Sequence, residues 1–407
     1  MTAQGNWSAG AGAGYRAPRY APRRGAVGRL VARESPLRRM DWILAFAALA
    51  LSGIGALLVW SATRSRTEIN HGDPQYFLIR HLMNLAIGLG LCVGVVLLGH
   101  QRLRTIAPVV YGLAVLGVLA VLSPLGSTVN GAHSWIVLGG GFSVQPSEFC
   151  KIAIILGMAT LLSARVDAGE RAFPDSRSIV QALALAAVPI GIILLMPDLG
   201  STMVMVVIIL GVLLASGAPK RWLFGLIAVG GAGAFVIVQL HVLKQYQIAR
   251  FAAFADPGLD PSGVGYNTAQ ARIAIGSGGL LGKGLFHGTQ TTGQFVPEQQ
   301  TDFVFTVAGE ELGFIGAGLI IVLLGVVLWR ACRIARQAND LYSTVVAAGV
   351  VAWFGFQGFE NIGMTLGIMP VAGIPLPFVS YGGSSMFAIW VGIGLLQSVK
   401  MHRDITA

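Results

Sequence analysis

The sequence predicts an all-α polytopic membrane protein of about ten transmembrane helices, with a large ordered extracytoplasmic loop between the seventh and eighth helices. Of the 407 residues, 54% are hydrophobic and only 11% are charged, whereas about 25% of the residues of a soluble globular domain are charged. Apolar stretches of about 20 residues, the length of a helix that crosses a bilayer, recur along the chain. These two observations exclude an ordinary soluble protein.

Each of the predicted spans is an apolar stretch bounded by polar or turn-forming residues. The stretches cover residues 42–62, 76–99, 106–123, 148–164, 179–196, 201–217, 222–242, 303–329, 343–366 and 383–399. An even number of spans places both termini on one side of the membrane. Together these spans form one membrane domain, residues 41–402.

The distribution of Lys and Arg predicts the orientation of the spans. If the N-terminus is cytoplasmic, 20 of the 28 basic residues lie in cytoplasmic segments and the rest lie on the outer side. Cytoplasmic loops of membrane proteins are enriched in Lys and Arg. Both termini are therefore expected in the cytoplasm.

Residues 1–40 form a basic cytoplasmic tail before the first span. The tail is rich in Gly, Ala, Pro and Arg and cannot bury a core, so it is expected to be disordered. Much of the net charge of +10 lies in this tail and in the short cytoplasmic loops. Such charge is typical of segments that bind anionic membrane lipids, and no nucleic acid is expected as a partner.

The segment 243–302 is a long polar connection between two spans. Loops of this length are usually functional or disordered, and this one is too apolar and too helix-patterned, at 268–275, to be disordered. It is expected to fold as an extracytoplasmic subdomain. Arg272, Lys283 and Glu298 are its candidates for binding a charged substrate.

Two charged side chains open the fourth span. Glu148 and Lys151 follow Pro146 and Ser147, which mark a helix start, and their spacing of three places them on one face. The pair either binds substrate or forms a local ion pair that seats the end of the helix. The residues alone leave both interpretations open.

Asp198 and Asp302 each precede a predicted span, where each could serve as a helix N-cap. With Glu148 and Lys151, however, they come from three separate segments that reach the same side of the membrane at similar depth. Carboxylates and an ammonium gathered at a membrane surface suit a substrate with a phosphate-bearing head and a lipid tail. These four residues form the predicted site.

The segment 370–385 is another non-helical stretch predicted on the outer side. Ser380 and Tyr381 carry hydroxyl groups there, and backbone N–H groups before the last span could hold an anion, although packing against the outer subdomain is an equal alternative. The glycine-rich stretch 275–284 fails the pattern of a phosphate-binding loop. The three cysteines indicate no disulfide framework, and the seven histidines show no metal-ligand spacing.

Several motifs together resemble the SEDS family of shape, elongation, division and sporulation proteins over about residues 41–402. They are, in chain order, Trp135, Gln145-Pro146-Ser147-Glu148 with Lys151, Pro197-Asp198-Leu199-Gly200, Pro297-Glu298 with Thr301-Asp302-Phe303, Gly309-Glu310-Glu311-Leu312-Gly313, Asn361-Ile362-Gly363, Pro375-Leu376-Pro377 and Ser380-Tyr381-Gly382-Gly383-Ser384. The stretch 273–290 is similar to the version in RodA, the elongation member, more than to that in FtsW, the division member.

The resemblance implies a peptidoglycan glycosyltransferase of the bacterial cytoplasmic (inner) membrane. Such enzymes polymerise lipid II into glycan strands on the outer side and release undecaprenyl diphosphate, in cell elongation and shape maintenance. A class B penicillin-binding protein, which is a transpeptidase, is the implied partner.

Asp302 matches the essential aspartate of the family and is the expected catalytic residue. It is either a base for the acceptor hydroxyl or a ligand for a divalent cation, Mg²⁺ or Mn²⁺, and no organic cofactor is expected. The expected substrate-binding residues are Lys151, Glu148, Asp198, Lys283, Arg272, Glu298, Ser380 and Tyr381.

Gln300 departs from the family pattern, which commonly has His immediately before Thr-Asp. Because an amide does not titrate, this position is not expected to act as an acid or base. Three alternatives compete: an FtsW-like division enzyme, a lipid II flippase and a non-catalytic scaffold. A flippase would tend to place charges near the midplane, often with inverted repeats, and a scaffold would not need the acidic cluster.

Overall fold

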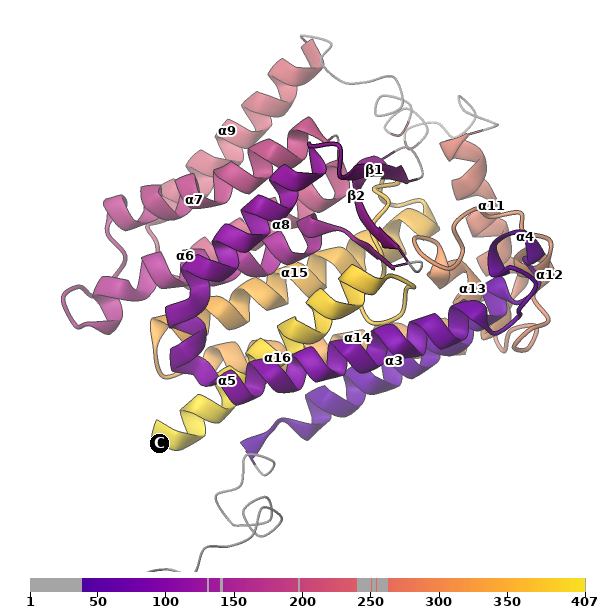
Figure 1. Cartoon of the computed structure of the whole chain (residues 1–407), viewed down its shortest axis with the longest axis horizontal. Coiled ribbons are helices and arrows are strands. Elements are labelled where there is room, and N and C mark those ends of the chain that lie inside the picture. The colour runs from indigo at the N-terminus through magenta and orange to yellow at the C-terminus, as the bar shows by residue number, and fades with distance from the viewer. Residues whose placement is uncertain are drawn as a thin grey trace, which may run out of the picture. The chain divides into compact units, whose positions relative to one another are not determined.

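The computed structural model describes residues 39–129, 132–139, 142–196, 198–239, 250, 254 and 263–406. The chain divides into two units after Met40, and all helices and strands named below belong to the second unit (Figure 1). The predicted disordered tail, residues 1–40, lies almost entirely outside the described residues, as does most of the first part of the predicted 243–302 loop.

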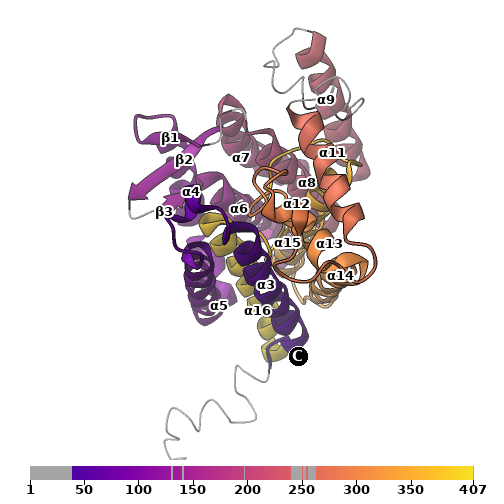
Figure 2. The same ribbon diagram turned by 90° about the vertical axis from the view of Figure 1, so that its right-hand side faces the viewer.

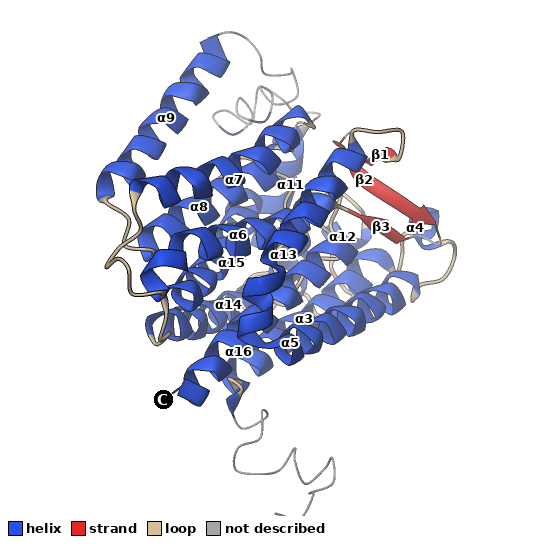
Figure 3. Ribbon diagram, turned by 60° about the vertical axis from the view of Figure 1, so that its left-hand side comes forward, coloured by secondary structure: helices blue, strands red, loops and turns tan. Residues whose placement is uncertain are grey.

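The second unit is mainly helical (Figure 3). Its helices are α3 (Trp42–Thr63), α4 (Thr67–Asn70), α5 (Tyr76–Val121), α6 (Pro146–Asp167), α7 (Ser176–Leu195), α8 (Leu199–Ala215), α9 (Lys220–Gln239), α11 (Val264–Ser277), α12 (Thr289–Thr292), α13 (Val304–Glu311), α14 (Gly313–Arg336), α15 (Leu341–Leu366) and α16 (Gly383–Thr406).

Within the described residues, seven helices are long and apolar enough to cross a membrane: α3, α5, α6, α7, α14, α15 and α16. The helix α8 is apolar but has only 17 residues. Large apolar side chains are exposed on these helices, including Leu97, Leu113, Leu214 and Phe314. Such a surface fits a protein whose solvent is lipid.

The 46-residue α5 contains two of the predicted spans, 76–99 and 106–123. Gly99 interrupts it with φ of 75° and ψ of 162°, a backbone conformation that only glycine adopts readily. α5 therefore consists of two helical segments. That the chain crosses the membrane ten times remains a prediction.

The core lies where α16 packs along α5 and where α15 packs against α6, α8 and α14. Polar side chains are fully buried in two of these helices, namely Lys151 in α6 and Gln357, Glu360 and Asn361 in α15. Burial of polar groups is costly unless they find partners. These residues are therefore candidates for function rather than for packing alone.

A three-stranded antiparallel sheet lies between α5 and α6 in the chain, so the all-α prediction was incomplete. Its strands are β1 (Gly126–Val129), β2 (Ala132–Gly139) and β3 (Phe142–Val144), in the order β1-β2-β3. Thr128 pairs with His133, and Val129 with Ala132. The sequence carries a hairpin signal here, because Asn130-Gly131 is a dipeptide typical of such turns, but the strands are too short to stand out against the apolar spans.

The predicted span 303–329 consists of two helices. α13 and α14 meet at Gly313, whose φ is 66°. The glycine-rich segment before α12 packs into this break: the backbone N–H of Lys283 donates to the carbonyl of Glu310 (3.0 Å), and that of Phe314 donates to the carbonyl of Gly279 (2.9 Å). The glycines flanking Glu310 and Glu311 thus accompany a broken helix, as such glycines often do.

One end of the helices carries the sheet together with α4, α11 and α12, whereas the C-terminus lies at the other end (Figures 1 and 2). The sheet, α4, α11 and α12 belong to the segments that the charge distribution assigns to the outside.

Candidate active site

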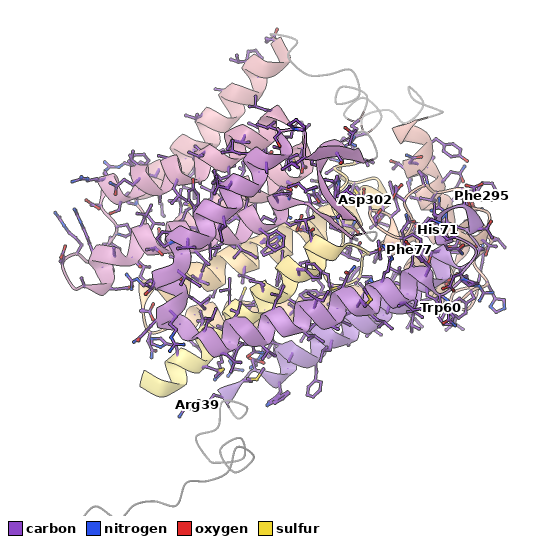
Figure 4. The ribbon with its side chains drawn as sticks, viewed as in Figure 1. Arg39, Trp60, His71, Phe77, Phe295 and Asp302 are labelled. Carbon is purple, nitrogen blue, oxygen red and sulfur yellow. The ribbon has the colours of Figure 1, made fainter. Side chains whose placement is uncertain are left out.

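Asp302 lies in the turn before α13, at the end of the helices that carries α4 and α12 (Figure 4). Its main chain is held by α15, because Nδ2 of Asn361 donates to the carbonyl oxygens of Asp302 (2.7 Å) and Ile374 (2.8 Å). Asn361 is fully buried. The side chain of one α15 residue therefore fixes this turn against the segment 370–382.

Further hydrogen bonds join residues 298–302 to the segment 370–382. The backbone N–H of Tyr381 donates to the carbonyl of Gln300 (2.8 Å). The hydroxyl of Ser380 donates to the carbonyl of Thr301 and accepts from the N–H of Leu376 (2.8 Å). Ser380, predicted to bind substrate, thus uses its hydroxyl to hold the backbone next to Asp302.

Two neighbouring carboxylates act on the carboxyl group of Asp302. Burial is the main cause that raises the pKa of Asp302 to about 7, and the Glu298 and Asp198 carboxylates raise it further, whereas Arg250 acts in the opposite direction. An unperturbed Asp has a pKa of about 3.9. Near neutral pH, Asp302 is therefore present in both protonation states, as catalytic acids and bases often are.

The backbone at Gly373 approaches this carboxyl closely. A Cβ added at Gly373 would lie 3.4 Å from Oδ2 of Asp302 and 4.0 Å from Nη1 of Arg250. The φ of Gly373 is 69°, a value that glycine tolerates without strain. A Cβ at this position would make ordinary contact with both charged groups, so Gly373 lies directly beside Asp302.

Asp198 performs the capping role that its position allowed and also joins the site. As N-cap of α8 it accepts from the N–H of Ser201 (3.0 Å). Its other oxygen accepts from Nε2 of Gln145 (3.2 Å) and from the hydroxyl of Ser147 (3.5 Å), both at the start of α6. The cap therefore links the N-terminal ends of α6 and α8 while its charge acts on Asp302.

Lys151 and Glu148 form a buried pair inside the helices. Nζ of Lys151 lies 2.6 Å from Oε1 of Glu148, and the side chains are 0% and 2% exposed. Lys151 also donates to Oε1 of Gln357 (3.1 Å), and Nε2 of Gln357 donates to the carbonyl of Pro375 (2.8 Å). In this conformation neither charge is accessible to a substrate, and Gln357 connects Lys151 to the segment 370–382.

Lys283 and Arg272 lie in different surroundings. Nζ of Lys283 pairs with Oε1 of Glu310 (2.8 Å), and it donates to the Thr289 hydroxyl (2.8 Å). Arg272 lies on the exposed side of α11. Neither residue is among the charged groups that shift the Asp302 pKa, which are Glu298, Arg250 and Asp198.

Two arginines that belong to none of the sequence motifs lie beside the turn that contains Asp302. Nη1 of Arg66 donates to Oε1 of Gln300 (3.0 Å). Arg80 hydrogen-bonds to the side chain of Tyr381, and its guanidinium lies over the Tyr76 ring (4.4 Å). A signal for both was present, because they belong to the few basic residues outside the segments predicted to be cytoplasmic.

Gln300 occupies the centre of this polar group. It is 7% exposed, and its Nε2 donates to Oε2 of Glu298 (3.3 Å) while its Oε1 accepts from Arg66. The amide thus bridges a cation and an acid, and it needs no titratable group to do so.

The carboxyl groups around Asp302 do not form a ready metal site. Among the residues that the structure describes, the group of three His, Cys, Asp or Glu side chains that could share one ion is His100, Asp340 and His402. Asp302 is not in that group. A cation at Asp302 would need further oxygen ligands from the substrate or from water.

The chain is similar to known proteins over most of its length. A family model described as "Cell cycle protein" and named for FtsW, RodA and SpoVE matches residues 41–405. "Stage V sporulation protein E" of Bacillus subtilis (strain 168) is 36% identical over 365 residues, which cover 89% of this chain and 97% of the relative. "Peptidoglycan glycosyltransferase MrdB" of Escherichia coli (strain K12) is 35% identical over 366 residues, which cover 90% of this chain and 95% of the relative.

Solved structures show the same likeness. A chain from a study described as "Structural coordination of polymerization and crosslinking by a peptidoglycan synthase complex" matches with a TM-score of 0.73 and 31% identity, over 89% of this chain and 98% of that one. The rod shape determining protein RodA of Thermus thermophilus matches with a TM-score of 0.65 and 30% identity, over 89% and 97% of the two chains. The chain therefore belongs to the SEDS family of FtsW, RodA and SpoVE, and it is a peptidoglycan glycosyltransferase of the bacterial membrane with several membrane-spanning helices.

Proposed function

We propose that this enzyme polymerises lipid II on the outer side of the cytoplasmic membrane, with Asp302 as its catalytic base. In this reaction the acceptor sugar's 4-hydroxyl loses its proton to the Asp302 carboxylate, and its oxygen forms a bond to the donor's anomeric carbon. The bond from that carbon to the lipid diphosphate breaks, and undecaprenyl diphosphate leaves with the electron pair.

The single observation that supports this role most strongly is the environment of the Asp302 carboxyl. Burial and two neighbouring acids raise its pKa to about 7. A general base is most effective when its pKa lies close to the working pH. The same carboxyl is held in place through its own backbone by Asn361.

Positive charge beside Asp302 suits the diphosphate of the donor. Arg250 acts electrostatically on Asp302, Arg66 contacts Gln300, and Arg80 contacts Tyr381. Arginine binds phosphate oxygens through several fixed N–H donors. We assign these arginines to the diphosphate, and Glu298, Asp198 and Tyr381 to the surrounding polar wall.

Lys151 and Glu148 support the site from inside the helices in this proposal. Their burial favours a positioning role through Gln357 and Pro375 over direct contact with substrate. A divalent cation, Mg²⁺ or Mn²⁺, remains the alternative role for Asp302, and no step above depends on it.

The proposed topology has ten crossings, with α5 contributing two, and both termini in the cytoplasm. The basic tail then faces anionic lipids, and a class B penicillin-binding protein packs beside the helices to crosslink the new strands. The role proposed is cell elongation. Labelling of a Lys283→Cys variant in intact cells by an impermeant reagent tests the orientation, and a cytoplasmic position of that residue would overturn the site assignment.

The test of the function is polymerisation by the purified full chain. Lipid II is supplied in detergent, alone and with the cognate transpeptidase, and the glycan products are separated by length. Long strands formed by the wild type, and their absence with Asp302→Asn, are the expected result. Transport of lipid II across vesicles without any strand formation would instead favour a flippase.

A further inference from the structure

Three metal-binding side chains meet at the end of α15 away from the active site. His100 follows the Gly99 break in α5, Asp340 precedes α15, and His402 lies near the end of α16. Asp340 and Asn361 are at opposite ends of α15, roughly 30 Å apart at a helix rise of about 1.5 Å per residue. The group is therefore separate from the Asp302 site.

The distances in this group suit a shared ion. Nε2 of His100 and Nε2 of His402 each lie 3.7 Å from Oδ2 of Asp340. This separation is too long for a hydrogen bond between imidazole and carboxylate. Two ligands on one tetrahedral zinc ion, with bonds of about 2.0–2.1 Å, lie roughly 3.4 Å apart, so each histidine nitrogen is close to the separation from Asp340 that a shared ion requires.

The carboxylate is already held in place by neighbouring donors. Oδ1 of Asp340 accepts from the N–H of Ser343 (2.7 Å), and Oδ2 accepts from the Ser343 hydroxyl (2.9 Å). The His100 ring packs edge-on against Tyr342 with centroids 5.0 Å apart, and its side chain is 8% exposed. Hydrogen bonds and packing that orient the ligands are typical of metal sites.

The two imidazole rings are stacked, with centroids 4.2 Å apart and planes 16° from parallel. Stacked rings cannot both direct a nitrogen lone pair at one ion, so one ring has to turn. We expect His402 to be the ring that turns, because it lies near the end of α16 and its side chain is 22% exposed against 8% for His100.

The surrounding charges favour a dication. Arg104, one turn after His100, pairs with Asp167 at 3.0 Å, and the other Asp167 oxygen accepts from the N–H of Leu341 beside Asp340 (2.9 Å). Asp340, Asp167 and Arg104 all act electrostatically on His100, so the carboxylates around this ring outnumber the guanidinium.

We propose that His100, Asp340 and His402 bind one transition-metal ion of the Zn²⁺ type, which fastens the end of α16 to α5 and α15. Two imidazoles and a carboxylate are common ligands of zinc. Because the three ligands come from distant parts of the chain, the ion stabilises the folded arrangement of these helices. The proposal does not depend on the glycosyl transfer mechanism.

Zinc binding by the purified full chain tests the proposal. A preparation without a polyhistidine tag is stripped with a chelator and titrated with Zn²⁺ by calorimetry, and with Co²⁺ by visible absorption. We expect one equivalent of metal, the absorption bands of cobalt bound to nitrogen and oxygen ligands, and a higher melting temperature with Zn²⁺ than without it.

Variants identify the ligands. His402→Ala should fold, since its side chain is partly exposed near a helix end, and it should lose the zinc-dependent rise in melting temperature together with the cobalt bands. Asp340→Asn keeps the helix cap and should weaken binding at least about tenfold. His71→Ala, which alters an exposed histidine elsewhere, is the matched control and should bind like wild type. Absence of stoichiometric binding by wild type, or equal binding by His402→Ala, would overturn the proposal.

Discussion

The side chain of Asn361 donates a hydrogen bond of 2.7 Å to the backbone carbonyl of Asp302. The same amide nitrogen holds the carbonyl of Ile374. One turn earlier in α15, Gln357 contacts both Lys151 and the carbonyl of Pro375. A single face of α15 thus positions the turn that contains Asp302 and the segment that packs over it.

Replacing Asn361 tests this positioning role. Asn361→Leu fills similar space but leaves two buried carbonyls without a donor, and we expect polymerisation of lipid II to fall about 100-fold, as small misplacements of catalytic groups often do. The initial rate of strand formation is the measurement. Thr365→Val is the matched control, because Thr365 is equally buried one turn further along α15 and its hydroxyl bonds only within the helix. Equal rates for the two variants would contradict the role.

Asp302→Asn should abolish polymerisation, with a loss of about 100-fold to 10,000-fold, the range typical of general bases. Asn keeps the shape and the backbone contacts of Asp302, so folding should be preserved and can be checked by the melting temperature. Asp175→Asn, at the N-cap of α7, controls for the chemical change itself. Near-normal synthesis by Asp302→Asn would show that this carboxylate is not the base.

The pKa of about 7 for Asp302 predicts the pH dependence of the reaction. A base acts in its ionised form, so the rate should rise with pH through the neutral range and fall as Asp302 becomes protonated below it. Glu298→Gln removes a negative neighbour that raises this pKa, and the midpoint should move to lower pH. Rates of polymerisation measured across the neutral range provide the check. If the midpoint of the pH–rate profile is the same in the Glu298→Gln variant as in the wild type, another group controls the profile.

Much of the fold was predictable because apolar stretches of membrane length dominate the sequence. The helices at 42–63, 146–167 and 341–366 follow the expected ranges closely. The sheet was missed because its short strands carry little weight beside such stretches. Glycines on both sides of Glu310 and Glu311 are a sequence signal for the helix break at Gly313. The packing of residues 278–284 between α13 and α14 has no such signal, because it depends on contacts between residues that are distant in the chain.

The active site was less predictable than the fold. Asp302 on its own resembles a helix cap, and its expected catalytic role came from a family motif. The partners Arg66 and Arg80 lie more than 200 residues away in the chain, and no spacing rule connects them to it. By charge alone, Lys283 is equally suited to bind the substrate, but its ammonium group forms an ion pair with Glu310. The approach of His100 to His402 likewise has no signature in sequence spacing.

Arg66 and Arg64 offer a matched pair for testing the diphosphate subsite. Arg66 contacts Gln300 in the catalytic segment, whereas Arg64 lies over the Phe286 ring at 4.7 Å. Arg66→Ala should lower kcat/KM for lipid II roughly tenfold to 100-fold, because a charge-assisted contact to phosphate contributes about 1.5–3 kcal/mol. Arg64→Ala should have little effect. Steady-state kinetics of both variants are the measurement. Similar losses of kcat/KM in the two variants would indicate a general effect of charge at this surface.

Variants of Lys151 and Glu148 show whether this pair positions the site or contacts the substrate directly. Lys151→Met leaves the Glu148 carboxylate buried without its cation, which typically costs 3–5 kcal/mol in other proteins, so this variant should be poorly folded. The double variant Glu148→Met with Lys151→Met removes both charges and should regain the melting temperature of wild type, since apolar pairs can replace buried ion pairs at little cost.

We expect this double variant to polymerise lipid II at about one tenth of the wild-type rate. Gln357 loses the Lys151 contact but keeps its bonds to Trp353 and Pro375, and misplacement of a supporting segment lowers rates without removing the chemistry. Melting temperature and initial rate are measured on the same preparation. A folded double variant as inactive as Asp302→Asn would show that the ammonium acts on the substrate, and that Lys151 must become accessible during the reaction.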